Sequence, residues 1–339
     1  MMKKTTSALA AAALLGTGIG TASAATFQID DSTSVDLGAR FYSWVTGTKD
    51  AEGKSQTNYA TSPRINVGAS SDAVNGLTVS TFMQFRPQAT LGNTKDDEND
   101  DGVRTHVAYG TVAGDFGSVT YGKNDNLFYR YLDILADKND VLTYTFSNAI
   151  QRTRVLTYAS PDFDGFGFEV EAALQGDNEK DALTDSASDN PGTRTSSKTS
   201  SINAAAYANL DPVTVHVAYA EGNLQNSNSD GAYGVGAVTT IQDVKVDAFY
   251  KYSNIYKDGV QGTKKQKIYG VIGEFDNSFG LVQLGAQQVK GNDISSRTEV
   301  IARGVYDLAD NVYVSAEYRK ADKSQDEGDG YALAFSYKF

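Results

Sequence analysis

The chain has 339 residues, and its 42 Asp and Glu residues outnumber its 30 Lys and Arg residues, which gives a formal net charge of −12. This acidity argues against a nucleic-acid partner, because such a partner requires a basic surface. The chain contains no cysteine, which excludes a disulfide framework and a thiol nucleophile. Its 32 Gly, 20 Tyr, 15 Phe and only 5 Pro are typical of a β-rich chain with many tight turns.

The N-terminal residues have the pattern of a secretory signal peptide. A basic start, Lys3-Lys4, is followed by an apolar run over 8–20 and a small-x-small site at Ala22–Ala24. We therefore expect a signal peptide over residues 1–24 and a mature, exported domain over 25–339. The apolar run is too short to span a bilayer as a helix, and no later segment approaches about 20 apolar residues.

The rest of the chain alternates between apolar and polar residues with a period of two, which predicts β-strands. In each strand one face is apolar and the other carries charge. The clearest examples are segments 35–42, 77–86, 166–174, 244–252 and 312–319. A soluble β-sandwich would show the same alternation, with its apolar face turned inward.

The connections between these strands distinguish the two architectures. Short and long connections alternate along the whole chain, and the long polar ones lie at about 48–58, 91–102, 124–150, 177–200, 222–230, 257–264, 291–296 and 322–329. This asymmetry is typical of outer-membrane barrels, which have short periplasmic turns and long extracellular loops. The sequence therefore predicts an all-β fold, a 16-stranded antiparallel transmembrane β-barrel, whose lumen is too wide for side chains alone to fill.

The last strand, Tyr331–Phe339, has an aromatic and aliphatic face that runs to the final residue. Tyr331, Leu333 and Phe335 begin this face, and Ala332 and Ala334 lie on the other one. A bare aromatic edge strand invites aggregation in water, whereas a closed barrel in lipid needs such an outer face.

In addition, the chain resembles the Gram-negative general porins over its mature length. The resemblance rests on the signal peptide, the rhythm of strands and loops, and the final strand. It also rests on Gly114–Lys123, similar to the turn and fifth strand of that family, and on Tyr158–Gly165, similar to the end of its sixth strand. It implies a homotrimeric outer-membrane channel for ions and small polar solutes, without a cofactor. It also implies that Tyr337 and Phe339 are read by the assembly machinery.

The resemblance further implies that the third loop, Asn124–Ile150, folds into the barrel and forms a constriction. The loop contains four aspartates, Asp125, Asp133, Asp137 and Asp140. The facing basic residues are expected to be Arg40, Arg64, Arg86, Arg104, Arg152 and Arg154. Opposed rows of charge would create a transverse field that favours small polar solutes over bulky apolar ones.

Other kinds of site have weak support in the sequence. The two histidines, His106 and His216, lie on separate strands without converging metal ligands. The acidic run Asp96–Asp101 lacks the context of an EF-hand, and a solvated loop explains it. No partner for a Ser–His or carboxylate–His catalytic pair can be placed, so we expect no enzyme activity.

Two alternative functions stay open at this stage. A substrate-selective channel would carry an aromatic track along its lumen, which Tyr42, Trp44 and Phe82 could begin. A structural or adhesive surface barrel would instead have a plugged lumen. For ion preference, the net negative charge and acidic loops favour cations, whereas the arginine ladder favours anions; we expect a mild preference for cations.

Overall fold

The computed structural model describes residues 25–49, 54–87, 103–142, 144–145, 152–174, 200–221, 229–257, 260–292, 294–322 and 329–339. The predicted signal peptide, residues 1–24, and the acidic run at 96–101 lie outside these residues, and both stay predictions.

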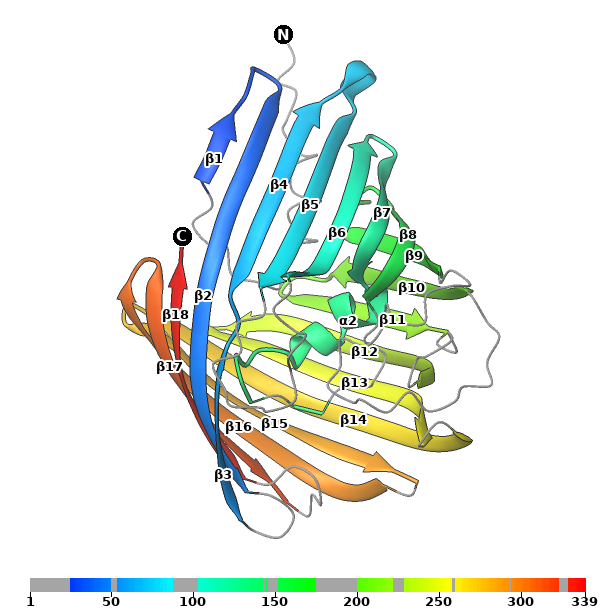
Figure 1. The fold of residues 1–339 in the computed structure, drawn as a ribbon. Helices are drawn as coiled ribbons and strands as arrows, with labels where there is room; N and C mark the ends of the chain where they lie inside the picture. Colours follow the sequence, from blue (N-terminus) through cyan, green and yellow to red (C-terminus); the bar gives the residue numbers. More distant parts are fainter. Residues whose placement is uncertain are drawn as a thin grey trace.

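The described chain is almost entirely β-strand, with three short helical segments (Figure 1). The strands are β1 (Ala25–Gln28), β2 (Thr33–Lys49), β3 (Ser55–Thr61), β4 (Arg64–Asp72), β5 (Thr78–Pro87), β6 (Val103–Gly114), β7 (Gly117–Asp125), β8 (Arg152–Ala159), β9 (Phe166–Leu174), β10 (Ser200–Asn209), β11 (Val213–Ala220), β12 (Ser229–Ile241), β13 (Val244–Lys257), β14 (Val260–Asn277), β15 (Gly280–Gly291), β16 (Ile294–Ala309), β17 (Val312–Ala321) and β18 (Gly330–Lys338). The helical segments are η1 (Val74–Gly76), α2 (Leu127–Tyr131) and η2 (Asp133–Leu135).

These strands form a closed 16-stranded antiparallel barrel, as the sequence predicts. Consecutive strands pair along the chain, and β18 closes the ring by pairing with β2 from Gly330 opposite Thr48 to Lys338 opposite Arg40. Two barrel strands are each built from two segments. β3 and β4 both pair with β2 and are separated at Ser62-Pro63, where proline cannot donate a ladder hydrogen bond. β1 and β18 both pair with the other edge of β2.

The connections that the sequence predicts to be short, and both described chain ends, lie on one side of the barrel. Examples of these connections are the β6–β7 turn at Asp115-Phe116 and the β14–β15 turn at Ser278-Phe279. On the opposite side, two connections are shorter than the predicted ranges 257–264 and 291–296, because β13 and β14 extend to Lys257 and Val260 and β15 and β16 extend to Gly291 and Ile294. The end of the chain is tied to β2, because the Phe339 amide donates to the Ala39 carbonyl at 2.9 Å and the Ala39 amide donates to the Phe339 carbonyl at 2.6 Å. Within the described residues, no helix is long and apolar enough to cross a membrane.

The two faces of each strand differ as the alternation predicts. In β18 the Leu333 side chain is 55% exposed on the outside of the barrel, whereas Ala332 is 1% exposed on the inside. In β17 the outward residues Val314 and Tyr318 alternate with the buried inward residues Ser315, Glu317 and Arg319. The apolar face therefore points away from the lumen, which excludes the soluble sandwich as the explanation of the pattern.

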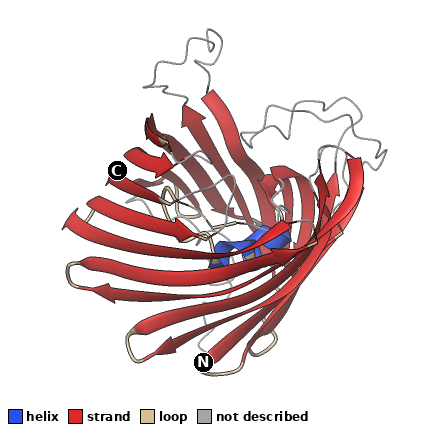
Figure 2. Cartoon of the chain, turned by 90° about the horizontal axis from the view of Figure 1, so that it is seen from below, coloured by secondary structure: helices blue, strands red, loops and turns tan. Residues whose placement is uncertain are grey.

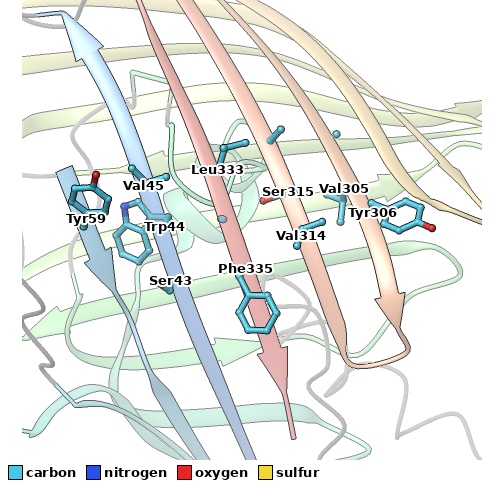
Figure 3. Close-up of a pocket in the computed structure, with 13 residues that line it drawn as sticks. Ser43, Trp44, Val45, Tyr59, Val305, Tyr306, Val314, Ser315, Leu333 and Phe335 are labelled. Atoms are coloured by element: carbon cyan, nitrogen blue, oxygen red, sulfur yellow. The ribbon is translucent and has the colours of Figure 1, made fainter. Parts of the chain in front are cut away.

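The outer surface has a shallow apolar depression over β2, β3, β16, β17 and β18 (Figure 3). It is lined by outward side chains that include Val45, Tyr59, Leu333 and Phe335. Because these residues belong to the outer, apolar face of the barrel, the depression is part of the lipid-facing surface and not of a route through the lumen.

Candidate functional site: the third loop and the inner wall

The third loop turns into the lumen immediately after β7 (Figure 2). The side chain of Asn126 caps α2, because its Oδ1 accepts a hydrogen bond from the Tyr129 amide at 2.9 Å. The described part of the loop then continues through η2 to residue 142 and includes residues 144 and 145. The described helical part of the loop contacts β10 to β13 of the barrel wall.

Small residues on the wall make room for α2. Leu127, Phe128 and Leu132 are fully buried against four alanines, Ala205, Ala218, Ala220 and Ala232, which lie on the inner face of β10, β11 and β12. A Cβ atom at Gly234 would lie 2.8 Å from the Leu132 side chain, so a larger residue at this position would push the helix away. The small alanine and glycine residues of the inner wall thus allow the loop helix to pack closely against the strands.

A second apolar contact fixes η2 and the segment that follows. Leu135, Ala136 and Tyr144 pack against inward residues of β13 to β16, namely Phe249, Ile268, Ile272, Val289 and Ile301. Five large apolar residues would be costly on a water-filled wall, but here the loop covers them. The loop therefore forms a second apolar core inside the barrel.

Buried ion pairs hold the same part of the loop. Asp133 and Lys251 of β13 lie 2.7 Å apart, and both side chains are 0% exposed. Arg130 contacts Glu169 at 3.1 Å and Glu171 at 3.5 Å, both on β9. Since a charge in a dry site is stable only when it is paired, each contact resists removal of either partner.

The distal part of the loop binds the wall through charges of both signs. Lys138 lies 3.1 Å from Asp247 of β13. Asp140 lies 3.1 Å from Arg40 of β2 and also contacts Arg303 of β16. Burial opposes the ionisation of Asp140, but the guanidinium groups of Arg303 and Arg40 outweigh it and hold the pKa of Asp140 below its ordinary value.

Two wall glutamates accept hydrogen bonds from the loop backbone. Glu317 of β17 accepts from the amides of Asp140 at 2.6 Å, Val141 at 3.2 Å and Leu142 at 2.6 Å. Glu299 of β16 accepts from the Thr145 amide at 2.9 Å and from its hydroxyl at 2.6 Å. The carboxylates on this wall therefore act as anchors for the loop.

The loop aspartates do not all have the expected position. Asp140 meets the barrel-wall arginine Arg40, as expected. Asp133 is buried in its ion pair with Lys251, so its expected role as a pore-lining carboxylate is wrong. Asp137 accepts a hydrogen bond from the Tyr129 hydroxyl within the loop. Asp125 ends β7 and lies opposite Arg152 in the register with β8.

Four of the six predicted arginines lie on the inner wall of neighbouring strands. Arg40 and Arg64 are register partners, and so are Arg86 and Arg104. Arg86 lies 2.6 Å from the Nε2 atom of His106, a buried residue at a bulge in β6.

The arginines of β8 differ from the expectation. Val155, with 0% exposure, faces inward, whereas Leu156, with 45% exposure, faces outward. Arg154 shares the outward parity of Leu156 and pairs in register with Lys123 and Leu174, so its assignment to the lumen is wrong. The side chain of Arg152 lies outside the described residues.

Most of the anchors were not predicted from the sequence. These are Arg130 and Lys138 on the loop and Glu169, Glu171, Asp247, Lys251, Glu299, Arg303 and Glu317 on the wall. The available signal was the presence of charged residues at inward positions of strands β9, β13, β16 and β17, but the alternation does not tell a solvated charge from an anchor.

Comparison with known proteins decides the family. A family model described as Gram-negative porin matches residues 6–326. The chain belongs to the Gram-negative porin family.

The relatives of this porin are outer-membrane proteins. It is 25% identical, over 270 residues, to a monosaccharide porin of Halomonas sp, with 69% of this chain and 72% of the relative covered. The same values hold for the major outer membrane protein of Halomonas elongata. The porin is therefore an outer-membrane β-barrel and a channel protein.

Solved structures share its fold. The Salmonella typhi OmpF complex with daunomycin has a TM-score of 0.73 at 17% identity, with 93% of this chain and 100% of that chain covered. An anion-selective porin from Comamonas acidovorans has a TM-score of 0.69 at 15% identity, with 91% and 100% covered. At these identities the likeness concerns the fold alone.

Proposed function

We propose that this porin is a passive channel for ions and small hydrophilic solutes, and that its constriction lies between the third loop and the arginines of β2, β4, β5 and β6. The observation that carries this proposal is the extensive anchoring of the loop on β9 to β17. Among the described residues, ion pairs, hydrogen bonds and apolar contacts join the loop to these strands, and Asp140 joins it to Arg40 at the start of the arginine wall. Solutes then pass between the loop and Arg64, Arg86 and Arg104.

The charges on the two sides of this passage support selection by size and polarity. The arginines lie on adjacent strands, and neighbouring cations repel one another unless anions face them. Asp137 and Asp140 supply negative charge on the loop. A bulky apolar solute would displace water from these charged groups without offering them polar contacts in return. A small polar solute, in contrast, is oriented by the field between the two rows of charge.

A homotrimer is part of this proposal. One of the similar solved structures is described as the trimer form of Vibrio cholerae OmpT, at 14% identity and a TM-score of 0.64. In planar bilayers we expect the purified porin to insert as a unit with three conductance sublevels. A structural or adhesive barrel with a plugged lumen would show no conductance, which would contradict the proposal.

The reversal potential in a KCl gradient tests the expected mild cation preference.

A sugar-selective channel is the second candidate, because aromatic pairs line part of the inner wall. The rings of Tyr42 and Trp44 are 5.1 Å apart, and those of Phe82 and Tyr109 are 5.7 Å apart. The Arg40 guanidinium lies 4.3 Å from the centre of the Tyr42 ring. Aromatic faces beside charged groups suit the C–H and hydroxyl faces of a sugar. One relative is named a monosaccharide porin.

Trp44 tests this second candidate directly, since it is the single tryptophan of the chain. If sugars bind at this wall, glucose should change the Trp44 fluorescence saturably and should block the ion current in a saturable manner. Trp44→Phe should keep the current block, and Trp44→Ala should weaken it about tenfold, a loss of about 1.4 kcal/mol. A current block that is the same in all three proteins would leave the general diffusion channel as the better description.

A further inference from the structure

Three lysines gather on the outer face of the barrel, near the end opposite the short turns. Lys265 and Lys267 lie at the start of β14, and Lys290 lies near the end of β15. All three are exposed and share the outward parity of Tyr269 and Val271. Because β14 ends at the Ser278-Phe279 turn, on the same side as the other short turns and the described chain ends, its start lies at the opposite, extracellular end of the barrel.

The lysines lie beside and just above tyrosines of the outer face. Tyr252 is opposite Lys267 in the register with β13, and its ring stacks on that of Tyr233 at 4.9 Å. The Lys290 Nζ atom lies 5.5 Å from the centre of the Tyr269 ring. Tyrosine belts mark the level of the lipid headgroups, so the ammonium groups lie at or just above that level.

Among the described residues, like charges meet in this cluster without a facing carboxylate. Lys267 and Lys290 are directly opposite in the ladder, an arrangement of like charges that destabilises a sheet. In the part of the chain that the structure describes, none of the three lysines forms an ion pair with a carboxylate. A cluster of cations on a chain with a net charge of −12 indicates an anion from outside the chain.

The surface below the lysines is apolar. Val271 and Leu284 point outward on the same two strands and are 50% and 61% exposed. A ligand that combined a phosphorylated headgroup with acyl chains would satisfy both parts of this surface, whereas free phosphate would use only the lysines. We propose that Lys265, Lys267 and Lys290 form a binding surface for a phosphorylated lipid of the outer leaflet.

The test measures binding of diphosphoryl lipid A to the detergent-purified porin by native mass spectrometry. Each Lys→Gln substitution at the three positions should weaken binding by about fivefold, the equivalent of about 1 kcal/mol per basic residue at a lipid surface. The Lys267→Gln/Lys290→Gln double variant should also lose most of the salt dependence of binding.

A matched control is Lys320→Gln. Lys320 is an exposed, outward lysine two residues after Tyr318, but a valine, Val300, lies opposite it. This variant should bind lipid A like the unmodified porin, and dephosphorylated lipid A should bind all forms weakly. Equal weakening by Lys320→Gln, unchanged binding in the double variant, or displacement of the lipid by inorganic phosphate would overturn the proposal. Circular dichroism verifies that each variant is a folded barrel.

Discussion

Lys251→Met should detach the helical part of the third loop from the barrel wall. The substitution removes the ion-pair partner of Asp133, whose side chain is fully buried 2.7 Å from the Lys251 ammonium. Breaking a buried pair in this way costs about 3–5 kcal/mol, because a carboxylate then stays in a dry site. We expect the barrel to persist, since the ladder of β13 is unchanged, and the loss to appear as faster hydrogen exchange over Leu132–Ala136 and faster proteolysis of the loop.

Two controls make this result specific. Lys251→Met combined with Asp133→Leu removes both charges and should restore most of the protection, since an apolar pair replaces the ionic one. Lys245→Met removes a lysine that is 46% exposed and lies 3.8 Å from Glu274, so it should cost less than about 1 kcal/mol. If Lys251→Met leaves the exchange rates unchanged, the buried pair does not hold the loop.

Glu317→Ala should release the distal part of the loop and widen the channel. Glu317 accepts hydrogen bonds from three successive amides, those of Asp140, Val141 and Leu142, and its loss leaves these donors without their acceptor. An unsatisfied buried donor costs about 1–3 kcal/mol, and the Leu142 amide becomes such a donor, while the partly buried amides of Asp140 and Val141 add to this cost. We expect a larger and noisier single-channel conductance and the passage of larger sugars.

Glu317→Gln serves as the matched variant. Its amide oxygen can still accept a hydrogen bond, so the conductance should stay closer to that of the unmodified porin than in Glu317→Ala. A conductance that falls in Glu317→Ala would mean that the released loop closes the passage, and an unchanged conductance would mean that the passage does not run beside residues 140–142.

The fold was predictable from the sequence because the alternation of apolar and polar residues within each strand shows which of its faces points outward. The alternation over Tyr331–Phe339 identifies which side chains face lipid without knowledge of any partner strand. The third loop was also visible, as a long interruption that contains Phe128 and Leu132. Its apolar residues indicated packing against a wall, and the contacts with Ala205 and Ala218 confirm this.

The contacts of the loop could not be predicted in the same way. The position of Asp133 against Lys251 depends on how an irregular segment lies across several strands, and no local period encodes that arrangement. In β8 the alternation itself was ambiguous, because Val155 faces inward, packs on Ala173 and precedes an outward Leu156. With apolar residues on both faces, the pattern does not reveal the side on which Arg154 lies.

Modification of single cysteines tests whether solutes pass along the arginine wall. The chain has no cysteine of its own, so each introduced thiol is the sole target of a charged methanethiosulfonate reagent. In planar bilayers, labelling of Arg64→Cys and Arg86→Cys should reduce the single-channel current, and labelling of Arg154→Cys, on the outward face, should leave it unchanged. Complete labelling of Arg64→Cys and Arg86→Cys without any change in current would show that solutes do not pass along this wall.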